Sequence, residues 1–159
     1  MEYKAGSLIL RTVTAEDIAE VARTWPSAHR PISETEAERE IARMEQNREK
    51  NRDGHIRHLC LAACMAEAPQ NIMGWCGLDG GRNPEEPEIF VLLDKEFRGQ
   101  GYGTRCIRLL LKIAAVEYGI QSVHGGCRKD NIASERAMEK AGMVQYGQEE
   151  NGDPLFRVK

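Results

Sequence analysis

One glycine-rich stretch of the chain has the composition of an anion-binding loop, Arg98-Gly99-Gln100-Gly101-Tyr102-Gly103. The apolar run at residues 89–93 predicts a buried strand before it, and apolar residues recur at helical spacing after it, up to Tyr118. Glycines at such a junction let successive backbone N–H groups turn toward a ligand, because no side chain stands in the way. The helix N-terminus adds roughly half a positive charge. The segment is therefore predicted to hold a phosphate.

Two common phosphate-binding loops do not match this stretch. A dinucleotide-binding fold has G-x-G-x-x-G near the start of a βαβ unit and an acidic residue about 20 positions later, whereas the spacing here is G-x-G-x-G and the loop lies late in the chain. A nucleoside-triphosphate loop ends in Gly-Lys-Ser/Thr, and Gly103-Thr104 has no lysine before it. For this segment alone, a plain strand-to-helix turn without a ligand remains the alternative.

A second segment, residues 130–143, predicts a short helix with an Asp or Asn cap and a glycine stop, followed by the start of a strand. Taken together, Arg98-x-x-Gly101-x-Gly103 and Asn131-x-x-Ser134 followed by Glu139-Lys140-x-Gly142 resemble the GNAT superfamily of N-acetyltransferases. The branch most similar in these motifs is the ribosomal-protein-alanine acetyltransferase type. The resemblance covers residues 72–146 and is only topological before them.

The resemblance implies acetyl-CoA as co-substrate and indicates which residues contact it. Backbone amides of residues 99–104 would hold the pyrophosphate, with Arg98 near the phosphates and the Thr104 hydroxyl assisting. A backbone N–H of the central strand would face the developing oxyanion, and the helix after Asn131 would flank the pantetheine arm. The cofactor-binding residues expected on this basis are Val91, Leu92, Leu93, Arg98, Gly99, Gln100, Gly101, Tyr102, Gly103, Thr104, Asn131 and Ser134.

The resemblance also implies the chemistry, which is direct attack of a primary amine on the thioester within a ternary complex. In the N-terminal-acetylating branch a glutamate lies ten positions before the site matched by Arg98, and Glu88 has that spacing. Glu88 is therefore the candidate base. A carboxylate with a reference pKa near 4.3 needs a water relay or a raised pKa to serve an amine. The alternative is a solvated carboxylate like Glu85 and Glu86.

The departing thiolate has no obvious proton donor in this sequence. Many GNAT members place a tyrosine where Met138 stands, and a methionine cannot donate a proton. Asn131, Ser134 and Met138 share one helix face, so Ser134 is the nearest replacement; an ordinary helix residue is an equal alternative. A thiol is acidic enough to leave with only a hydrogen bond. His124 and Cys127, on the preceding strand, could approach the site but are expected to be buried strand residues.

Composition limits the classes of partner. The chain has 159 residues with 41% hydrophobic and 30% charged residues, which predicts one globular domain over residues 1–159. A net charge of −3 without a basic cluster disfavours a nucleic-acid partner. No apolar run approaches the ~18 residues of a membrane span, so no membrane association is expected. Five cysteines without a C-x-x-C motif suit a reducing cytoplasm.

No metal site is expected, although His55, His58, Cys60 and Cys64 carry suitable side chains. A second matching cluster is missing, and a strand over residues 59–65 would place the two cysteines on one face of the core.

The predicted elements run in the order β-α-α-β-β-β-α-β-α-β-β, which is an α+β layered domain with one mixed, mostly antiparallel sheet, in agreement with the GNAT topology. Thr14 is expected to cap the first helix and Ser33 the second, with a loop at residues 26–31 between them and a hairpin turn at residues 69–71. The strand after the central helix is expected at residues 121–127. In the resembled fold it diverges from the central strand and leaves a slot for pantetheine.

The second helix carries Glu34, Glu38 and Glu45, which are either solvated or face a cationic amine.

Two functions from other classes remain open at this stage. One is a non-catalytic acyl-CoA-binding regulatory domain, which the missing tyrosine favours. The other is a nucleotide-binding module, for which the loop spacing is wrong. The acceptor is also open among a protein N-terminus, a polyamine, an amino acid and an aminoglycoside, and so is assembly as a homodimer.

Overall fold

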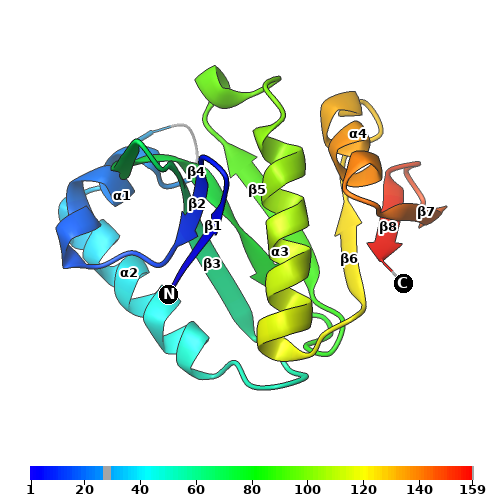
Figure 1. Ribbon diagram of the computed structural model, residues 1–159, viewed down its shortest axis with the longest axis horizontal. Coiled ribbons are helices and arrows are strands. Elements are labelled where there is room, and N and C mark those ends of the chain that lie inside the picture. Colours follow the sequence, from blue (N-terminus) through cyan, green and yellow to red (C-terminus); the bar gives the residue numbers. More distant parts are fainter. Residues whose placement is uncertain (27–29, 159) are drawn as a thin grey trace.

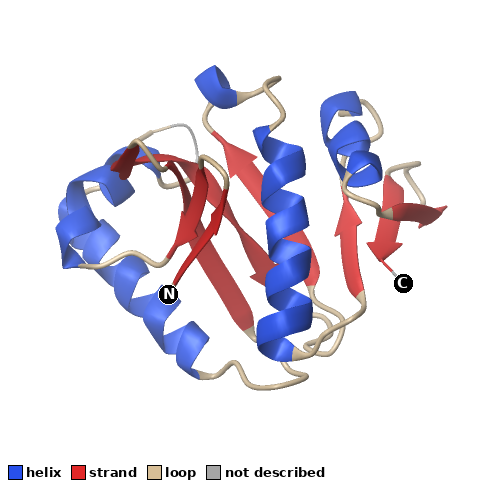
Figure 2. Ribbon diagram, viewed as in Figure 1, coloured by secondary structure: helices blue, strands red, loops and turns tan. Residues whose placement is uncertain are grey.

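The computed structural model describes residues 1–26 and 30–158, which form one eight-stranded sheet with helices on both faces (Figures 1 and 2). The strands are β1 (Glu2–Ala5), β2 (Leu8–Arg11), β3 (His58–Met65), β4 (Ala68–Asp79), β5 (Glu88–Leu93), β6 (Val123–Gly126), β7 (Val144–Gln148) and β8 (Pro154–Val158). The α-helices are α1 (Ile18–Thr24), α2 (Glu34–Glu49), α3 (Tyr102–Tyr118) and α4 (Ile132–Lys140), with short 3-10 helices η1 (Ala15–Asp17) and η2 (Lys95–Phe97). The strand order is β1-β2-β3-β4-β5-β6-β8-β7, and within the described residues only β5 and β6 are parallel. The predicted α+β fold with a mixed, mostly antiparallel sheet is confirmed.

The sheet separates two hydrophobic cores, and strand β3 contributes to both. Its residues Leu59, Leu61 and Ala63 pack in the core that α3 covers, while Cys60, Ala62 and Cys64 pack in the core under α1 and α2. This alternation follows from the two-residue period of a strand. The two cysteines thus share one buried face, as predicted, and the described part of the chain contains no cluster of side chains that could hold a metal ion.

Helix α3 forms where the sequence predicts it. Its buried residues, Cys106, Ile107, Leu109, Leu110, Ile113, Ala114 and Tyr118, make one apolar stripe against the sheet. The helix ends at Gly119, which adopts the left-handed conformation with φ 62° and donates its N–H to Ala114 O. Among the described residues, no helix is both long and apolar enough to span a membrane.

Strands β5 and β6 separate soon after they meet. Their parallel register contains a single pair, Glu88 with His124. Figure 1 shows the two strands running in the same direction and moving apart toward their C-terminal ends, with α3 lying over the space between them. A connection through a helix is what a parallel pair requires. The slot that the family resemblance implies therefore has a counterpart in this sheet.

Several predicted boundaries are wrong. The hairpin between β3 and β4 turns at Ala66 and Glu67, and residues 69–71 lie inside β4. Because Met65 pairs with Ala68 while Cys64 pairs with Ile72, those three residues bulge out of the ladder, so their Pro and Asn mark a bulge instead of the turn. Strand β6 is shorter than predicted, and the polar edge strand β1 was not predicted. The predicted loop at residues 26–31 lies partly outside the described residues.

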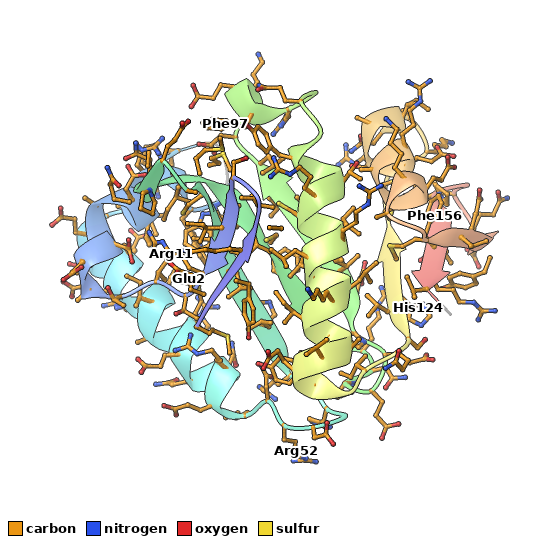
Figure 3. The ribbon with its side chains drawn as sticks, viewed as in Figure 1. Glu2, Arg11, Arg52, Phe97, His124 and Phe156 are labelled. Atoms are coloured by element: carbon orange, nitrogen blue, oxygen red, sulfur yellow. The ribbon has the colours of Figure 1, made fainter. Side chains whose placement is uncertain are left out.

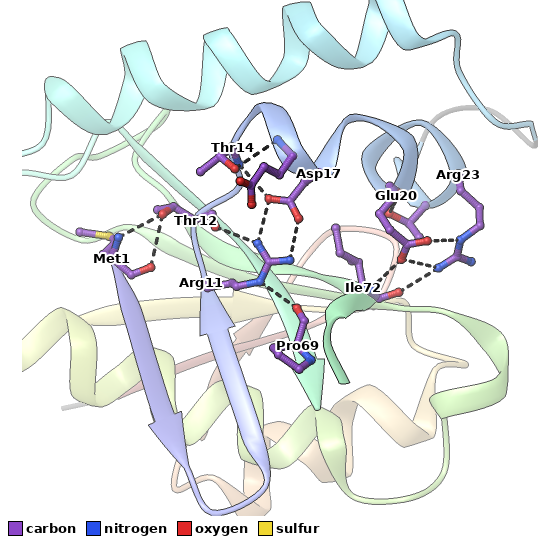
Figure 4. Close-up of polar contacts among 11 residues, drawn as sticks. Met1, Arg11, Thr12, Thr14, Asp17, Glu20, Arg23, Pro69 and Ile72 are labelled. Atoms are coloured by element: carbon purple, nitrogen blue, oxygen red, sulfur yellow. Dashed lines mark hydrogen bonds and ion pairs between the residues drawn. The ribbon is translucent and has the colours of Figure 1, made fainter. Parts of the chain in front are cut away.

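A buried ion pair joins β2 to the start of the first helical segment (Figure 4). The guanidinium of Arg11 forms two hydrogen bonds with the Asp17 carboxylate, of 2.9 and 2.8 Å, and Asp17 also accepts the Thr14 N–H at 2.8 Å. Thr14 caps η1 as predicted. Burial alone raises the pKa of Asp17, but the hydrogen bonds from Arg11 and Thr14 outweigh it and leave the pKa lowered.

We expect Asp17→Asn to lower the free energy of unfolding by about 2 to 3 kcal/mol at pH 7, because it leaves the Arg11 charge half-buried without its partner. The folded-state pKa of Asp17 is lowered, so its contribution is present above the unfolded value and is lost as pH falls through the folded value. The difference from wild type should therefore shrink below about pH 4.

Urea denaturation between pH 7 and pH 3 measures this difference, with Glu16→Gln as the control at an exposed neighbour. An equal loss at both pH values would mean that packing, and not the charge of Asp17, carries the stability.

Candidate active site

The glycine loop presents a run of free backbone donors at the start of α3. Gly99 and Gly101 adopt φ values of 73° and 86°, in the left-handed region that favours glycine, and a Cβ at either position would enter open space. The N–H groups of residues 99–104 form no hydrogen bond with any described residue. Free donors at a helix N-terminus favour an anion, so the loop fits a pyrophosphate.

Side chains of the loop hold its own backbone. Arg98 donates from Nε to Leu93 O at 3.0 Å, which fixes the loop to the end of β5. Gln100 donates to Glu96 O at 2.7 Å, and the Tyr102 ring packs edge-on against Phe97. These contacts leave the backbone amides and the half-buried Thr104 as the groups that a ligand would meet. Figure 3 labels Phe97 beside this loop.

Two backbone N–H groups of β5 point into the space that opens where β6 separates from it. Asp94 donates its N–H to Met73 O on β4, whereas Pro87 O accepts a hydrogen bond from His124 on β6. Because backbone groups alternate between the two edges of a strand, Val91 and Leu93 point their N–H groups toward β6. Leu92 points its N–H toward β4 and exposes half of its side chain on the other face of the sheet. Of the three predicted strand residues, Val91 and Leu93 can therefore act as donors.

Asn131 and Ser134 lie at the start of helix α4, which packs against α3. The Asn131 side chain accepts the Ser134 N–H at 3.1 Å and so caps the helix. The Ser134 hydroxyl forms no hydrogen bond with the described residues. One turn later on the same face, Ala137 lies against α3, with its Cβ 3.8 Å from a Cβ built on Gly103. Ser134 therefore sits on the side of α4 that faces the first turn of α3.

Met138 is a core residue. It is 4% exposed, and its Sδ would lie 2.8 Å from a Cβ at Gly125, so a side chain at position 125 would force Met138 to move. At the position where many family members are expected to have a tyrosine, this chain therefore has a side chain that packs against the sheet. No proton donor replaces it at that position.

A pocket of about 720 Å³ opens on the other face of the sheet, beside β6. Ile89 and Val123 lie in the core under α3, so their strand neighbours Glu88 and His124 face away from α3 and into this pocket. The pocket continues along β6 to Arg128, beyond the point where the strands separate. Its lining is rich in carboxylates: Asp79, Glu86, Glu88, Glu149 and Asp153. The exposed Glu34, Glu38 and Glu45 of α2 do not line it.

His124 contradicts the sequence prediction of a buried strand residue. Its side chain is 27% exposed and lines the pocket. The imidazole Nε2 lies 3.0 Å from Glu86 Oε2, and Nδ1 lies 3.1 Å from the Tyr146 hydroxyl. Hydrogen bonds from His124 and Ser122 lower the pKa of Glu86, which is therefore more than a solvated carboxylate. Figure 3 labels His124 near the β8 end of the sheet.

Cys127 is also only partly buried, because β6 ends one residue before it. Burial raises the pKa of its thiol, which keeps it protonated near neutral pH.

No periodicity in the sequence indicates the contact between His124 and Tyr146, because β8 lies between β6 and β7.

Comparison with known proteins identifies the family and agrees with the fold. The family model described as "Acetyltransferase (GNAT) domain" matches residues 7–144. A ribosomal-protein-S5-alanine acetyltransferase from Vibrio fischeri is similar in structure, with a TM-score of 0.79 at 13% identity over 99% of this chain and 95% of that one. A GNAT-family acetyltransferase from Bacillus anthracis has a TM-score of 0.76 at 15% identity over 99% and 98% of the two chains.

RimL, a ribosomal L7/L12 α-N-protein acetyltransferase solved with coenzyme A, has a TM-score of 0.71 at 16% identity over 99% of this chain and 97% of that one. A search of curated protein sequences finds none that matches.

We expect Gly101→Val to weaken the binding of coenzyme A by tenfold or more, about 1.4 kcal/mol, because a branched side chain would occupy the space above the loop. Isothermal calorimetry measures the affinity. Valine at φ 86° is also strained, so Gly54→Val, at φ 72° and equally open but remote from the loop, is the control. Unchanged affinity in a folded Gly101→Val protein would contradict the assignment.

Proposed function

The chain belongs to the GNAT acetyltransferase family, and on that premise we propose that it moves the acetyl group of acetyl-CoA to a primary amine by direct attack in a ternary complex. The observation that carries this proposal is the gap between β5 and β6. It lies between free loop amides on one side and an acidic pocket on the other face of the sheet.

Acetyl-CoA is the co-substrate of this family and supplies the thioester that the amine attacks. In this chain the amides of residues 99–104 would bind the pyrophosphate. Arg98 would keep those amides in position through its hydrogen bond to β5, and Asn131 and Ser134 would flank the pantetheine. The N–H groups of Val91 and Leu93 would donate to the acetyl oxygen as negative charge develops on it. Donors fixed by a strand need no reorganisation at that moment.

The acidic pocket suits a cationic acceptor. Five carboxylates line it against two arginines, Arg82 and Arg128, so an alkylammonium group would be attracted there. The pocket is open enough for either a small amine or a protein N-terminus. RimL and the S5-alanine enzyme are named for ribosomal proteins, and this supports the N-terminus as one of the two acceptors that we propose.

We assign the base to Glu88, acting through a water molecule. Its exposed carboxylate faces the pocket at the last position where β5 and β6 are paired, just before the gap. Only a free amine can attack the thioester, and an alkylammonium near pKa 10 is almost wholly protonated at pH 7. A carboxylate beside the amine would both hold the ammonium and draw its proton.

Ser134 is proposed to donate a hydrogen bond to the departing thiolate. Ser134→Ala should lower kcat by a few-fold to about a hundredfold, whereas Met138→Leu, a core substitution of similar volume, should retain nearly all activity. Thiol release followed with a chromogenic disulfide measures both variants. Loss of turnover in Met138→Leu with intact coenzyme A binding would overturn this view of the helix.

Glu88→Gln keeps size and hydrogen bonding but cannot take a proton. We expect kcat/KM to fall by about 10² to 10⁴-fold at pH 7 and the deficit to shrink as pH rises, because solvent then deprotonates the amine unaided. Coenzyme A affinity should hardly change, since the glycine loop lies at the other end of β5. Glu85→Gln, an exposed neighbour outside the pocket, is the control.

A wild-type kcat/KM for Glu88→Gln across pH 6.5 to 9.5 would remove Glu88 from the mechanism. A deficit that does not vary with pH would make it an anchor for the ammonium. The same assay separates transfer from a non-catalytic acyl-CoA-binding domain, which the core position of Met138 favours. Such a domain would bind coenzyme A but release no thiol with any amine.

A further inference from the structure

Three side chains from separate parts of the chain form one hydrogen-bonded row in the acidic pocket. Glu86 comes from the loop before β5, His124 from β6 and Tyr146 from β7, and all three line the pocket. The row runs from the Glu86 carboxylate to Nε2 of the imidazole at 3.0 Å, and from Nδ1 to the Tyr146 hydroxyl at 3.1 Å. It ends with the phenolic oxygen in the same pocket as Glu88.

The carboxylate at one end sets the direction of the row. Glu86 can only accept a hydrogen bond when it is ionised, so a neutral His124 places its proton on Nε2 and leaves Nδ1 as an acceptor. Tyr146 then donates its hydroxyl proton to Nδ1. The phenolic oxygen keeps lone pairs that can accept a hydrogen bond from a water molecule or an ammonium in the pocket. A carboxylate–imidazole–hydroxyl row of this kind is the arrangement that withdraws a proton from its hydroxyl end.

The charges around the imidazole also suit a proton acceptor. Glu86 contacts it, Glu88 is its partner in the β5–β6 register, and Arg157 is its partner on β8. The Arg157 guanidinium lies over the Tyr146 ring, 4.8 Å from its centroid, and holds that ring against the sheet. Two carboxylates therefore face His124 against one cation, so the positive charge that the imidazole gains when it accepts a proton lies next to opposite charges.

We propose that Glu86, His124 and Tyr146 are a proton relay that takes the ammonium proton of the acceptor amine. The relay rests on the proposed function and names where the proton goes after the water held by Glu88. A carboxylate is a poor final acceptor, whereas imidazole is the only unperturbed side chain that changes charge between pH 5 and 8. The phenolic oxygen accepts one proton from the pocket while its own passes to Nδ1.

The step balances without any oxidant or further reactant. One N–H bond of the ammonium breaks, the water held by Glu88 gains one O–H bond and loses another, the Tyr146 O–H bond breaks and re-forms, and one N–H bond forms at Nδ1 of His124. The positive charge moves from the amine to the imidazolium, next to the Glu86 carboxylate, which stays ionised. The amine lone pair becomes free to attack, and the imidazolium later releases its proton to solvent or to the departing thiolate.

The competing view is that this row only fastens β7 and the loop before β5 to β6. Such a structural contact would affect stability, or every kinetic parameter alike, and would not change the shape of a pH profile. A relay in series makes two further demands. Breaking it at either residue must give the same loss, and breaking it twice must cost no more than breaking it once.

The experiment measures kcat/KM of His124→Gln, Tyr146→Phe and the double variant from pH 5.5 to 9.5. The acceptor is an amine or N-terminal peptide that wild type acetylates. We expect each single variant to lose about tenfold to a hundredfold at pH 7 and the double variant to lose no more. All three should change the shape of the wild-type pH profile in the same way. His55→Gln and Tyr3→Phe, outside this pocket, are the matched controls.

Thermal melting and calorimetry with coenzyme A accompany the kinetics. Tyr146→Phe keeps the ring under Arg157, so it tests the relay even if His124→Gln fails to fold. A wild-type pH profile in folded Tyr146→Phe, or losses that multiply in the double variant, would overturn the relay and leave the proposed function intact. A wild-type protein that acetylates neither small primary amines nor N-terminal peptides would overturn the proposed function and the relay with it.

Discussion

The structure depends on one constraint, which is that β5 and β6 are parallel neighbours that pair at a single position. A parallel pair needs a crossover helix, and α3 supplies it directly after the glycine loop. Because pairing stops at Glu88 and His124, the N–H groups of Val91 and Leu93 have no strand partner on that side. Unsatisfied donors at the edge of a sheet would be a liability elsewhere, but here they line the space into which a thioester would enter. In the function that we propose, this separation provides both the binding slot and its donors.

The same separation connects the two faces of the sheet. Residues that alternate along β5 and β6 divide between the core under α3 and the acidic pocket, so donor and acceptor can approach from opposite sides. Glu88 and His124 stand at the last paired position, where the strands are still held rigidly together. Groups that handle protons need such fixed positions more than the loops around them do. Gly125, which leaves room for Met138 and Met143, lets β6 lie close enough under α4 to keep this arrangement.

The sequence predicts the parts of this site that local patterns encode. The glycine loop, the stripe of α3 with its Gly119 end and the Asn131 cap are all local, and the structure has them where expected. The predicted hairpin turn at residues 69–71 failed because the same residue types also suit a bulge. The actual turn at Ala66 and Glu67 carries no glycine or proline to mark it.

The hydrogen-bonded row of Glu86, His124 and Tyr146 could not be predicted because it depends on strand order. His124 and Tyr146 are 22 residues apart in the chain and meet only because β8 lies between β6 and β7, so that side chains of these two strands can reach each other across it. Glu86 is 38 residues from His124 and lies in a loop whose path no periodicity specifies. Residues in the interior of a strand are usually buried. His124 is partly exposed because, among the described residues, no helix covers that face of β6, and the sequence alone does not show this. Only the arrangement of the whole sheet provides that information.

Coenzyme A is proposed to bind across the glycine loop and to extend into the space between β5 and β6. Residue-resolved amide hydrogen exchange, with and without saturating coenzyme A, tests it most directly. The account predicts slower exchange at residues 99–104 and at Val91 and Leu93, while Leu92, whose N–H already faces β4, changes little. Protection of the loop alone would place the pantetheine elsewhere, and protection of neither segment in the presence of bound coenzyme would contradict the account.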